Sequence, residues 1–288
     1  MRNAWILMAV AIVFWGINWP IMKIGLNEIG PLWFAALRVS LAALVLFAYL
    51  GLRGQLRLPD RSEGPVLLSV GVLQIGVFMA MIHTAVQFVD AGRSAVLVYT
   101  TPIWAAPMAY WYLAERLNSR QVIGVLCAVA GLLALFNPFS FAWHDTDSVL
   151  GNGLLLGAAI IWAAVIVHVR GFGWSRPHLG LLPWQMVLGA AVLVPLAWTV
   201  EGPPSIPLNG QFFIIMAFNA IFATAFAFWA YLSAAKTLPA NTTAMASLGV
   251  PMVGIAASAG LIGESLSPEL AAGLAFIILG QIVFHRKA

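Results

Sequence analysis

Three tryptophans stand near the centres of long apolar segments in this 288-residue chain, namely Trp15, Trp104 and Trp162. An indole ring can stack on an aromatic or flat apolar ligand, and its N–H group is a hydrogen-bond donor. The rings are therefore candidates for the wall of a ligand cavity. Ordinary packing between helices explains the same residues equally well, so the sequence leaves both interpretations open.

Prolines inside apolar segments are a second candidate feature. Pro20, Pro102 and Pro251 each remove one helical hydrogen bond and free the carbonyl four residues earlier. Such a carbonyl can accept a bond from an ammonium group, and the kink can serve as a hinge. We assign a gating or hinge role to all three, with plain kinked packing as the alternative.

Polar and aromatic side chains surround these positions and complete the predicted set. We expect it to line a substrate cavity whose members are Trp15, Asn18, Trp19, His83, Tyr99, Thr100, Trp104, Trp162, Trp229 and Ser247.

Ionisable side chains are scarce inside the apolar segments. His83 and Arg38 are the clearest cases, whereas the acidic residues all fall in loops or at segment ends. A buried carboxylate for proton coupling is therefore not predicted. His83 titrates near neutrality and could take that part, or it could be a histidine hydrogen-bonded within a helix bundle. Arg38 is expected to face a wet cavity or a helix end.

The composition identifies the solvent in which these residues must be positioned. Hydrophobic residues make up 62% of the chain and charged residues 8%, whereas soluble domains carry roughly 25% charged residues. A soluble globular protein is thereby excluded. A bilayer core needs about 20 apolar residues per helix, and ten such stretches are predicted, at about 4–24, 31–51, 65–86, 94–114, 121–137, 149–169, 182–200, 211–235, 242–262 and 269–285.

Lysine and arginine residues predict the orientation. With the N-terminus in the cytoplasm, that side receives Arg2, Arg53, Arg57, Arg61, Arg116, Arg120, Arg170, Arg176, Lys236, Arg286 and Lys287. The other side receives only Lys23 and Arg93. We expect both termini to be cytoplasmic in a multi-pass protein. The basic residues follow this topology, and no cluster of them indicates a nucleic acid partner.

The two halves of the chain resemble each other. A shift of 149 residues places Pro102 on Pro251 and Glu115 on Glu264, and a shift of 147 places Trp15 on Trp162. Each half holds five segments, an odd number, so the second half must enter the membrane upside down. Inverted repeats are a signature of alternating access. We predict two domains, at 3–137 and 149–286, with a cavity between segments 1, 3, 4, 6, 8 and 9.

The matched segments also carry a family resemblance. In the first half, Thr101-Pro102 is followed by Ala114-Glu115-Arg116-Leu117, and in the second half Val250-Pro251 is followed by Gly263-Glu264-Ser265-Leu266. This resembles the tandem EamA domain of the drug/metabolite transporter (DMT) superfamily. The resemblance implies an all-α fold of ten transmembrane helices in two inverted five-helix repeats, in a bacterial plasma membrane. Length and tryptophan content are similar to those of aromatic amino acid exporters of the YddG type.

These observations predict an exporter of small amphipathic metabolites, foremost amino acids with aromatic or neutral side chains. A drug, nucleoside or quaternary amine exporter of the same fold is the alternative. An intramembrane enzyme is disfavoured because no HExxH, GxSxG or Cys/His couple is present. The expected partners are a small solute and the lipid bilayer, with no metal and no cofactor, and the chain is expected to be a monomer or homodimer.

Overall fold

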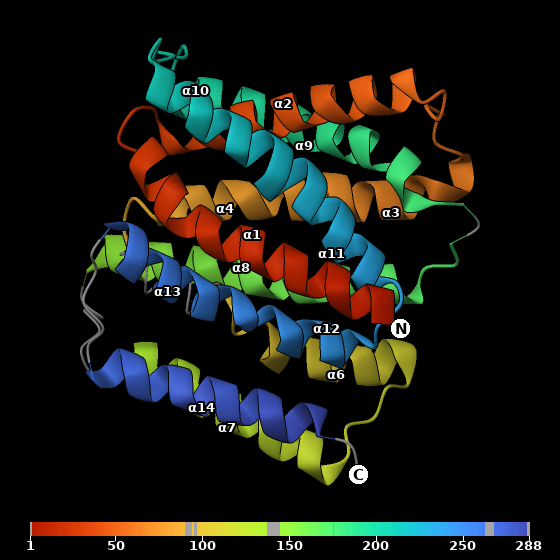
Figure 1. Cartoon of the computed structure of the whole chain (residues 1–288), viewed down its shortest axis with the longest axis vertical. Helices are drawn as coiled ribbons and strands as arrows, with labels where there is room; N and C mark the ends of the chain where they lie inside the picture. The colour runs from red at the N-terminus through yellow and green to blue at the C-terminus, as the bar shows by residue number, and fades with distance from the viewer. Residues whose placement is uncertain are drawn as a thin grey trace.

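Helices build every part of the chain that is described in a computed structural model of the protein (Figure 1). The structure describes residues 2–89, 94, 97–136, 145–174, 176–262 and 268–286. A chain in lipid must satisfy its backbone polar groups internally, and a helix does so within one segment. The repeated residues Ala91, Ala95 and Glu264 lie outside the described residues.

Helices cover each of the ten predicted segments within this part of the chain. In the first half they are α1 (Arg2–Gly25), α2 (Pro31–Leu52), the continuous series η1 (Arg61–Glu63), α3 (Gly64–Leu68), η2 (Ser69–Val77) and α4 (Phe78–Ala85), then α6 (Thr101–Leu113) and α7 (Ser119–Phe136). In the second half they are α8 (Thr146–Gly171), η4 (His178–Gly180) with α9 (Leu182–Glu201), α10 (Gly210–Ala217) with η5 (Phe218–Phe226) and α11 (Ala227–Ala235), α12 (Ala240–Ser247) with α13 (Gly249–Ile262), and α14 (Pro268–His285). Seven of these segments are long and apolar enough to cross a membrane, and α7 and α14 contain shorter apolar stretches.

The last helices of the two halves, α7 and α14, pack against each other in antiparallel orientation. A side chain at Gly124 would collide with the Gly280 carbonyl, and one at Gly131 with the Gly273 carbonyl. The contacts therefore run in opposite directions along the two helices, which touch through small residues as membrane helices commonly do. Equivalent segments of the two halves thus point in opposite directions.

Helices α2 and α9, the second segments of the two halves, show the same inversion. Glu201 at the end of α9 accepts hydrogen bonds from the Leu32 and Trp33 amides at the start of α2, at 2.7 and 3.0 Å. Phe47 near the end of α2 meets Trp184 near the start of α9, with ring centroids 5.0 Å apart. The predicted fold, two inverted five-helix repeats, is confirmed.

Both halves depart from regular helix geometry at equivalent places. The π-helices η2 and η5 are nine residues long, and the second begins 149 residues after the first. The turn at Tyr99–Thr100 before α6 likewise has its counterpart at Leu248, between α12 and α13. π-Helical turns often occur at functional sites, and transporter sites are commonly built at interrupted helices.

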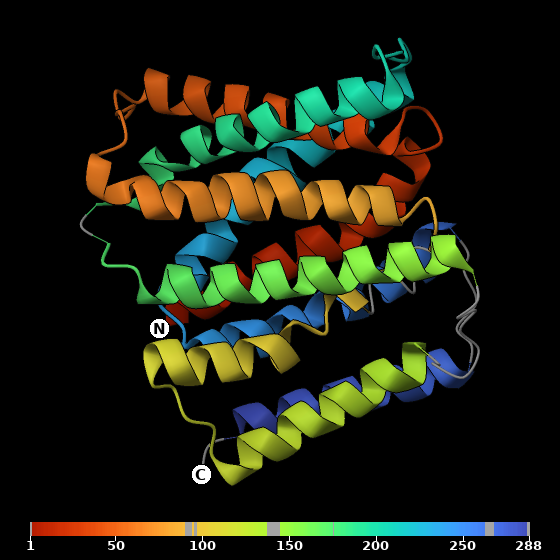
Figure 2. The ribbon, with the colours of Figure 1, turned by 180° about the vertical axis from the view of Figure 1, so that it is seen from behind.

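The two chain ends lie on the same side of the helix bundle, where α1 begins and α14 ends (Figure 1). We call this side the N-terminal face. The view from behind shows α8 beside the segment formed by η2 and α4 (Figure 2). On the N-terminal face, Arg57 forms two hydrogen bonds of 2.6 Å with Glu63, which raise the pKa of the Arg57 guanidinium.

Candidate functional site

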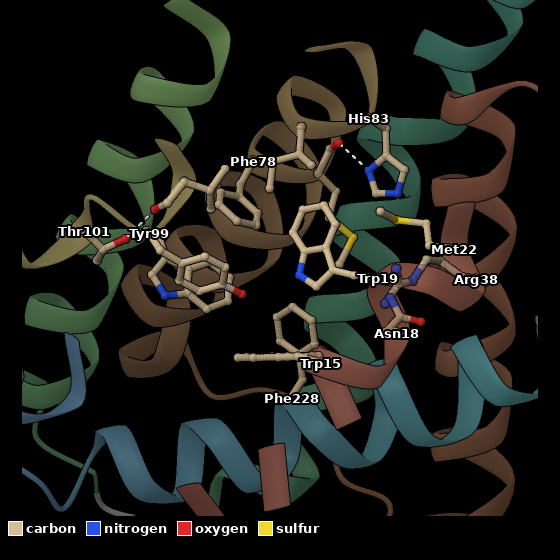
Figure 3. A pocket seen from close by; sticks show the side chains of 14 residues that line it. Trp15, Asn18, Trp19, Met22, Arg38, Phe78, His83, Tyr99, Thr101 and Phe228 are labelled. Atoms are coloured by element: carbon tan, nitrogen blue, oxygen red, sulfur yellow. Dashed lines mark hydrogen bonds between the residues drawn. The ribbon is translucent and has the colours of Figure 1, made fainter. Parts of the chain in front are cut away.

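A central cavity lies where the two halves meet, and it holds about 660 Å³ of empty space. Ligand pockets of small molecules usually measure 300–1,000 Å³. Helix α1 contributes Trp15, Asn18, Trp19 and Met22, and the first half adds residues of α2, α4 and the turn before α6. The second half contributes Trp162 of α8 and Phe228 of α11. Figure 3 shows the side chains converging on this space.

Aromatic rings form one end of the cavity. Trp15 lies edge to face against Trp162, with centroids 5.4 Å apart, and Phe228 lies 5.4 Å from Trp15. Phe78 approaches Trp162 to 4.6 Å. Since aromatic pairs prefer such tilted and edge-to-face arrangements, the rings form a closed layer that apolar and aromatic groups can contact.

Hydrogen bonds fix both central indoles to the eighth segment. Trp162 Nε1 donates to the Tyr231 hydroxyl at 3.0 Å, and Trp15 Nε1 donates to the Ala223 carbonyl at 2.9 Å. Ala223 lies in η5, and at its end the Ala227 amide reaches the carbonyl five residues back, that of Phe222. Returning from this spacing to α-helical spacing skips one carbonyl. The π-helix thereby presents an acceptor to the centre of the protein.

A polar group of residues forms the other end of the cavity, where Arg38, His83 and Asn18 lie close to one another in Figure 3. Their exposed fractions are only 4%, 3% and 6%. Arg38 Nε donates to Thr224 Oγ1 at 2.9 Å, and Nη2 reaches the Ala223 carbonyl at 3.4 Å. The π-helix therefore anchors the guanidinium as well as Trp15.

Arg38 has no acidic partner among the residues that the structure describes. A buried charge without a counter-ion is costly in a membrane and usually has a function. The described cavity lining contains no aspartate or glutamate. This end of the cavity is thus electropositive.

His83 and Asn18 add unused acceptors to the same polar end. His83 Nδ1 lies 2.8 Å from the Met79 carbonyl, so this nitrogen carries the proton and neutral His83 has its lone pair on Nε2. Neither His83 Nε2 nor Asn18 Oδ1 has a hydrogen-bond partner, although both atoms are buried. Buried polar atoms are normally paired, so these two are available to a ligand.

The predicted cavity residues fall into two groups. Those that line the cavity are Trp15, Asn18, Trp19, His83, Tyr99 and Trp162. The other four lie outside its lining: Thr100 and Trp104 bond to each other at 3.2 Å, Ser247 bonds to the Ala244 carbonyl, and Trp229 packs against Phe226. No residue of α12 or α13 lines the described cavity, because α13 instead packs on α1, where Val253 meets Gly16.

Several lining residues were not singled out in the sequence. Phe78, Met79, Ile82, Met22 and Phe228 are apolar side chains in apolar helices, so no contrast in polarity distinguishes them. Thr101 lines the cavity where its neighbour Thr100 was predicted, and its hydroxyl donates to the Val98 carbonyl at 2.8 Å. The carbonyl that Pro102 was expected to free is therefore already occupied.

The three predicted hinge prolines occupy different positions in their helices. Pro20 lies inside α1, whereas Pro102 is the second residue of α6 and Pro251 the third of α13. In the first turn of a helix a proline removes no existing hydrogen bond. Pro102 and Pro251 therefore mark the start of a helix directly after the equivalent breaks at Tyr99–Thr100 and Leu248.

The cavity extends from the aromatic layer away from the N-terminal face. Asn18, Trp19 and Met22 follow Trp15 toward the far end of α1, and Arg38 lies near the beginning of α2 on that same side. On the N-terminal face, Glu115 accepts from the Ala240 amide at 3.1 Å and Arg170 Nη1 donates to the Lys236 carbonyl at 3.3 Å. These contacts join helices of both halves and close the N-terminal side.

Two inverted five-helix halves around a shared cavity define a membrane transporter architecture. The chain belongs to the EamA-like transporter family, whose profile matches residues 3–137 and 149–285. This confirms the family predicted from the sequence and identifies a multi-pass membrane protein.

Relatives with curated descriptions are transporters. The chain is 27% identical to the uncharacterized transporter YoaV of Bacillus subtilis over 84% of this chain and 83% of that one. It is 24% identical to a probable amino-acid metabolite efflux pump of Salmonella typhimurium over 98% and 94% of the two chains. It is 28% identical to the uncharacterized inner membrane transporter YedA of Escherichia coli over 94% and 85%. A crystal structure of a protein with 19% sequence identity has a TM-score of 0.81 over 99% of this chain and 97% of that chain, which supports the fold.

Proposed function

We propose that this transporter exports small amphipathic solutes, foremost amino acids with aromatic or neutral side chains. The observation that carries the proposal is the composition of the central cavity, which joins an aromatic layer at Trp15 and Trp162 to a polar end at Arg38. A solute with one flat apolar part and one charged part matches both ends. The amino-acid metabolite efflux pump among the relatives agrees with this choice.

Alternating access is the mechanism that the inverted halves favour. The cavity is closed on the N-terminal face by contacts such as that between Glu115 and Ala240. If the halves exchange conformations, the opposite side closes and the N-terminal side opens. The breaks before Pro102 and Pro251 are where we expect α6 and α13 to change direction, while Pro20 provides a third bend.

The direction of transport follows from the charge bias. Eleven basic residues belong to the N-terminal face and two to the other, which assigns the N-terminal face to the cytoplasm of a bacterial inner membrane. Both termini are then cytoplasmic. A solute loaded from the cytoplasm would leave through the side to which the present cavity extends.

The alternatives have less support from the cavity. A quaternary amine would find aromatic rings for cation–π contacts, but it would meet the cation of Arg38 in the same space. An intramembrane enzyme needs a nucleophile with a base or a bound metal, and among the described residues no group of His, Cys, Asp and Glu could hold a metal ion.

Solute counterflow in proteoliposomes tests the proposal. Vesicles that contain the purified full chain are preloaded with an amino acid, a nucleoside or a quaternary amine, and uptake of the labelled solute is followed. We expect saturable exchange that is fastest for tryptophan, phenylalanine and neutral amino acids. Exchange restricted to quaternary amines would contradict the amino acid assignment, and conductance without saturation would contradict a carrier.

A further inference from the structure

We infer that the polar end of the cavity is a receptor for the ionised head group of a free α-amino acid. In it, Arg38 binds the carboxylate, while Asn18 Oδ1 and His83 Nε2 accept from the ammonium group. This inference rests on the proposed function and deepens it, because it states which part of the solute each end of the cavity recognises.

The first argument is the missing counter-charge of Arg38. The guanidinium carries five N–H donors, and the contacts to Thr224 and Ala223 use only its Nε and Nη2 atoms. No carboxylate of the described chain pairs with it. An anion in the cavity would supply both the missing charge and the missing acceptors, and arginine binds a planar carboxylate through two parallel bonds.

The number of charges in the cavity selects a carboxylate rather than a phosphate. Arg38 is the only lysine or arginine in the described lining. One cation neutralises a carboxylate, whereas a phosphate carries close to two negative charges near neutral pH and would leave one of them uncompensated in a buried site.

The second argument is the pair of unused acceptors. Neutral His83 exposes the lone pair of Nε2 because Nδ1 is held by Met79, and the buried Asn18 Oδ1 also has no partner. An ammonium group donates three hydrogen bonds and accepts none. Because both acceptors are neutral and Arg38 is charged, the carboxylate must contribute more to binding than the ammonium.

The arrangement of the cavity leaves the aromatic end for the side chain of the amino acid. Arg38, His83 and Asn18 gather on one side of Figure 3, and Trp15 and Phe228 lie on another. A solute held by its head group would therefore direct its side chain toward the aromatic layer. Small neutral side chains would leave part of that layer uncovered and bind more weakly.

Three solutes with one shared side chain test the head group directly. These are L-phenylalanine, L-phenylalaninamide, in which a neutral amide replaces the carboxylate, and 3-phenylpropionate, which lacks the ammonium. Binding is measured by competition with labelled phenylalanine on the purified full chain in lipid nanodiscs. We expect phenylalaninamide to bind at least about tenfold more weakly than phenylalanine, because hydrogen bonds to charged groups are the stronger ones, and 3-phenylpropionate to fall between them.

Variants then assign the recognition to residues. Arg38→Gln should lower phenylalanine affinity at least about tenfold and make phenylalanine and phenylalaninamide bind equally, while Arg38→Lys should keep a preference for the carboxylate. Asn18→Val should instead narrow the gap between phenylalanine and 3-phenylpropionate. Arg53→Gln is the matched control, because Arg53 follows the other end of α2 and is exposed. The ligand-free melting temperature checks folding, and if Arg38→Gln does not fold, the three solutes on the unmodified protein decide.

The outcomes separate this inference from the proposed function. Equal binding of phenylalanine and phenylalaninamide to the unmodified protein, or unchanged selectivity in Arg38→Gln, overturns the receptor. If none of the three solutes binds to a protein that still exchanges another solute saturably, the receptor is wrong and the carrier stands. If no solute is exchanged saturably, the proposed function itself fails.

Discussion

Trp15 and Trp162, which occupy equivalent positions in the two inverted halves, touch each other edge to face with ring centroids 5.4 Å apart and an angle of 72° between their planes. The axis that relates the halves therefore passes between these two rings. Their N–H partners differ, because Trp15 bonds to the Ala223 carbonyl and Trp162 to the Tyr231 hydroxyl. Both partners belong to the eighth segment, so the pair departs from two-fold symmetry, as a carrier open to one side must.

Truncation of either ring is expected to weaken solute binding. Trp15→Ala and Trp162→Ala each remove an aromatic contact worth about 0.5–1.5 kcal/mol beyond the buried area, so affinity for phenylalanine should fall about tenfold. Isothermal titration of the purified variants measures the change. Trp111→Ala serves as the control because Trp111 is 82% exposed on the outside of α6. Unchanged affinity in both variants would place the solute elsewhere.

Removal of the Tyr231 hydroxyl is expected to favour the opposite conformation. In Tyr231→Phe the indole N–H of Trp162 loses its partner in the present state only, which costs about 1 kcal/mol and shifts the equilibrium about fivefold. The reporter is Ser247→Cys in a chain with Cys127→Ala, since Ser247 is buried near the end of α12. Its alkylation by a membrane-impermeant reagent from the N-terminal face should rise.

The control for that measurement is Tyr49→Phe, a change of the same size at a half-exposed position on α2. It should leave the alkylation rate of the reporter as it was. A Tyr231→Phe protein that is labelled no faster than this control would show that the hydroxyl does not distinguish the two states.

Glu115 is expected to hold the N-terminal side of the carrier closed. Its carboxylate accepts from the Ala240 and Asn241 amides at the start of α12, where the helix dipole favours negative charge, and lies 3.7 Å from Arg170. Glu115→Ala removes this cap at a cost of about 1–2 kcal/mol. The Ser247→Cys reporter should again be labelled faster, and solute loading from the N-terminal face should become faster than release from the other side.

Asp147→Ala is the comparison for Glu115→Ala, because it removes an exposed carboxylate at the start of α8 on the far side of the protein. It should not change labelling from the N-terminal face. Equal effects of the two substitutions would mean that a change in net charge, rather than a lost cap, is responsible.

The sequence predicts the fold almost completely, and the reason lies in the solvent. Because lipid allows only internally bonded segments, apolar length alone locates each helix, and the spacing of Pro102 and Glu115 from Pro251 and Glu264 reveals the repeat. The same uniformity hides local detail. The π-helices η2 and η5 have no distinctive residue pattern, yet η5 supplies the carbonyl of Ala223 that anchors Trp15 and Arg38.

The cavity was harder to predict, because depth and direction are different properties. Trp104 lies at the expected depth, but its ring turns toward Thr100 on its own side of α6. Phe78 and Phe228 reach the cavity without any polar signal. A helix that is apolar on all sides has no moment from which its inner face can be determined, so only the packing of α4 and α11 reveals which residues face the solute.

The contact between α7 and α14 should not tolerate larger residues. A Cβ atom at Gly280 would lie 2.6 Å from the Gly124 carbonyl oxygen and 2.7 Å from the Ala128 amide nitrogen, both rigid backbone atoms. Gly280→Leu must therefore separate the two helices, which should cost about 1–3 kcal/mol and lower the melting temperature in detergent. Gly260→Ala is the matched control, because no atom lies within 4 Å of its added Cβ, and the better helix propensity of alanine should leave the melting temperature equal or higher. If Gly280→Leu melts together with Gly260→Ala, the fifth and tenth segments do not contribute to stability as a packed pair, and their antiparallel contact would have no energetic part in joining the two halves.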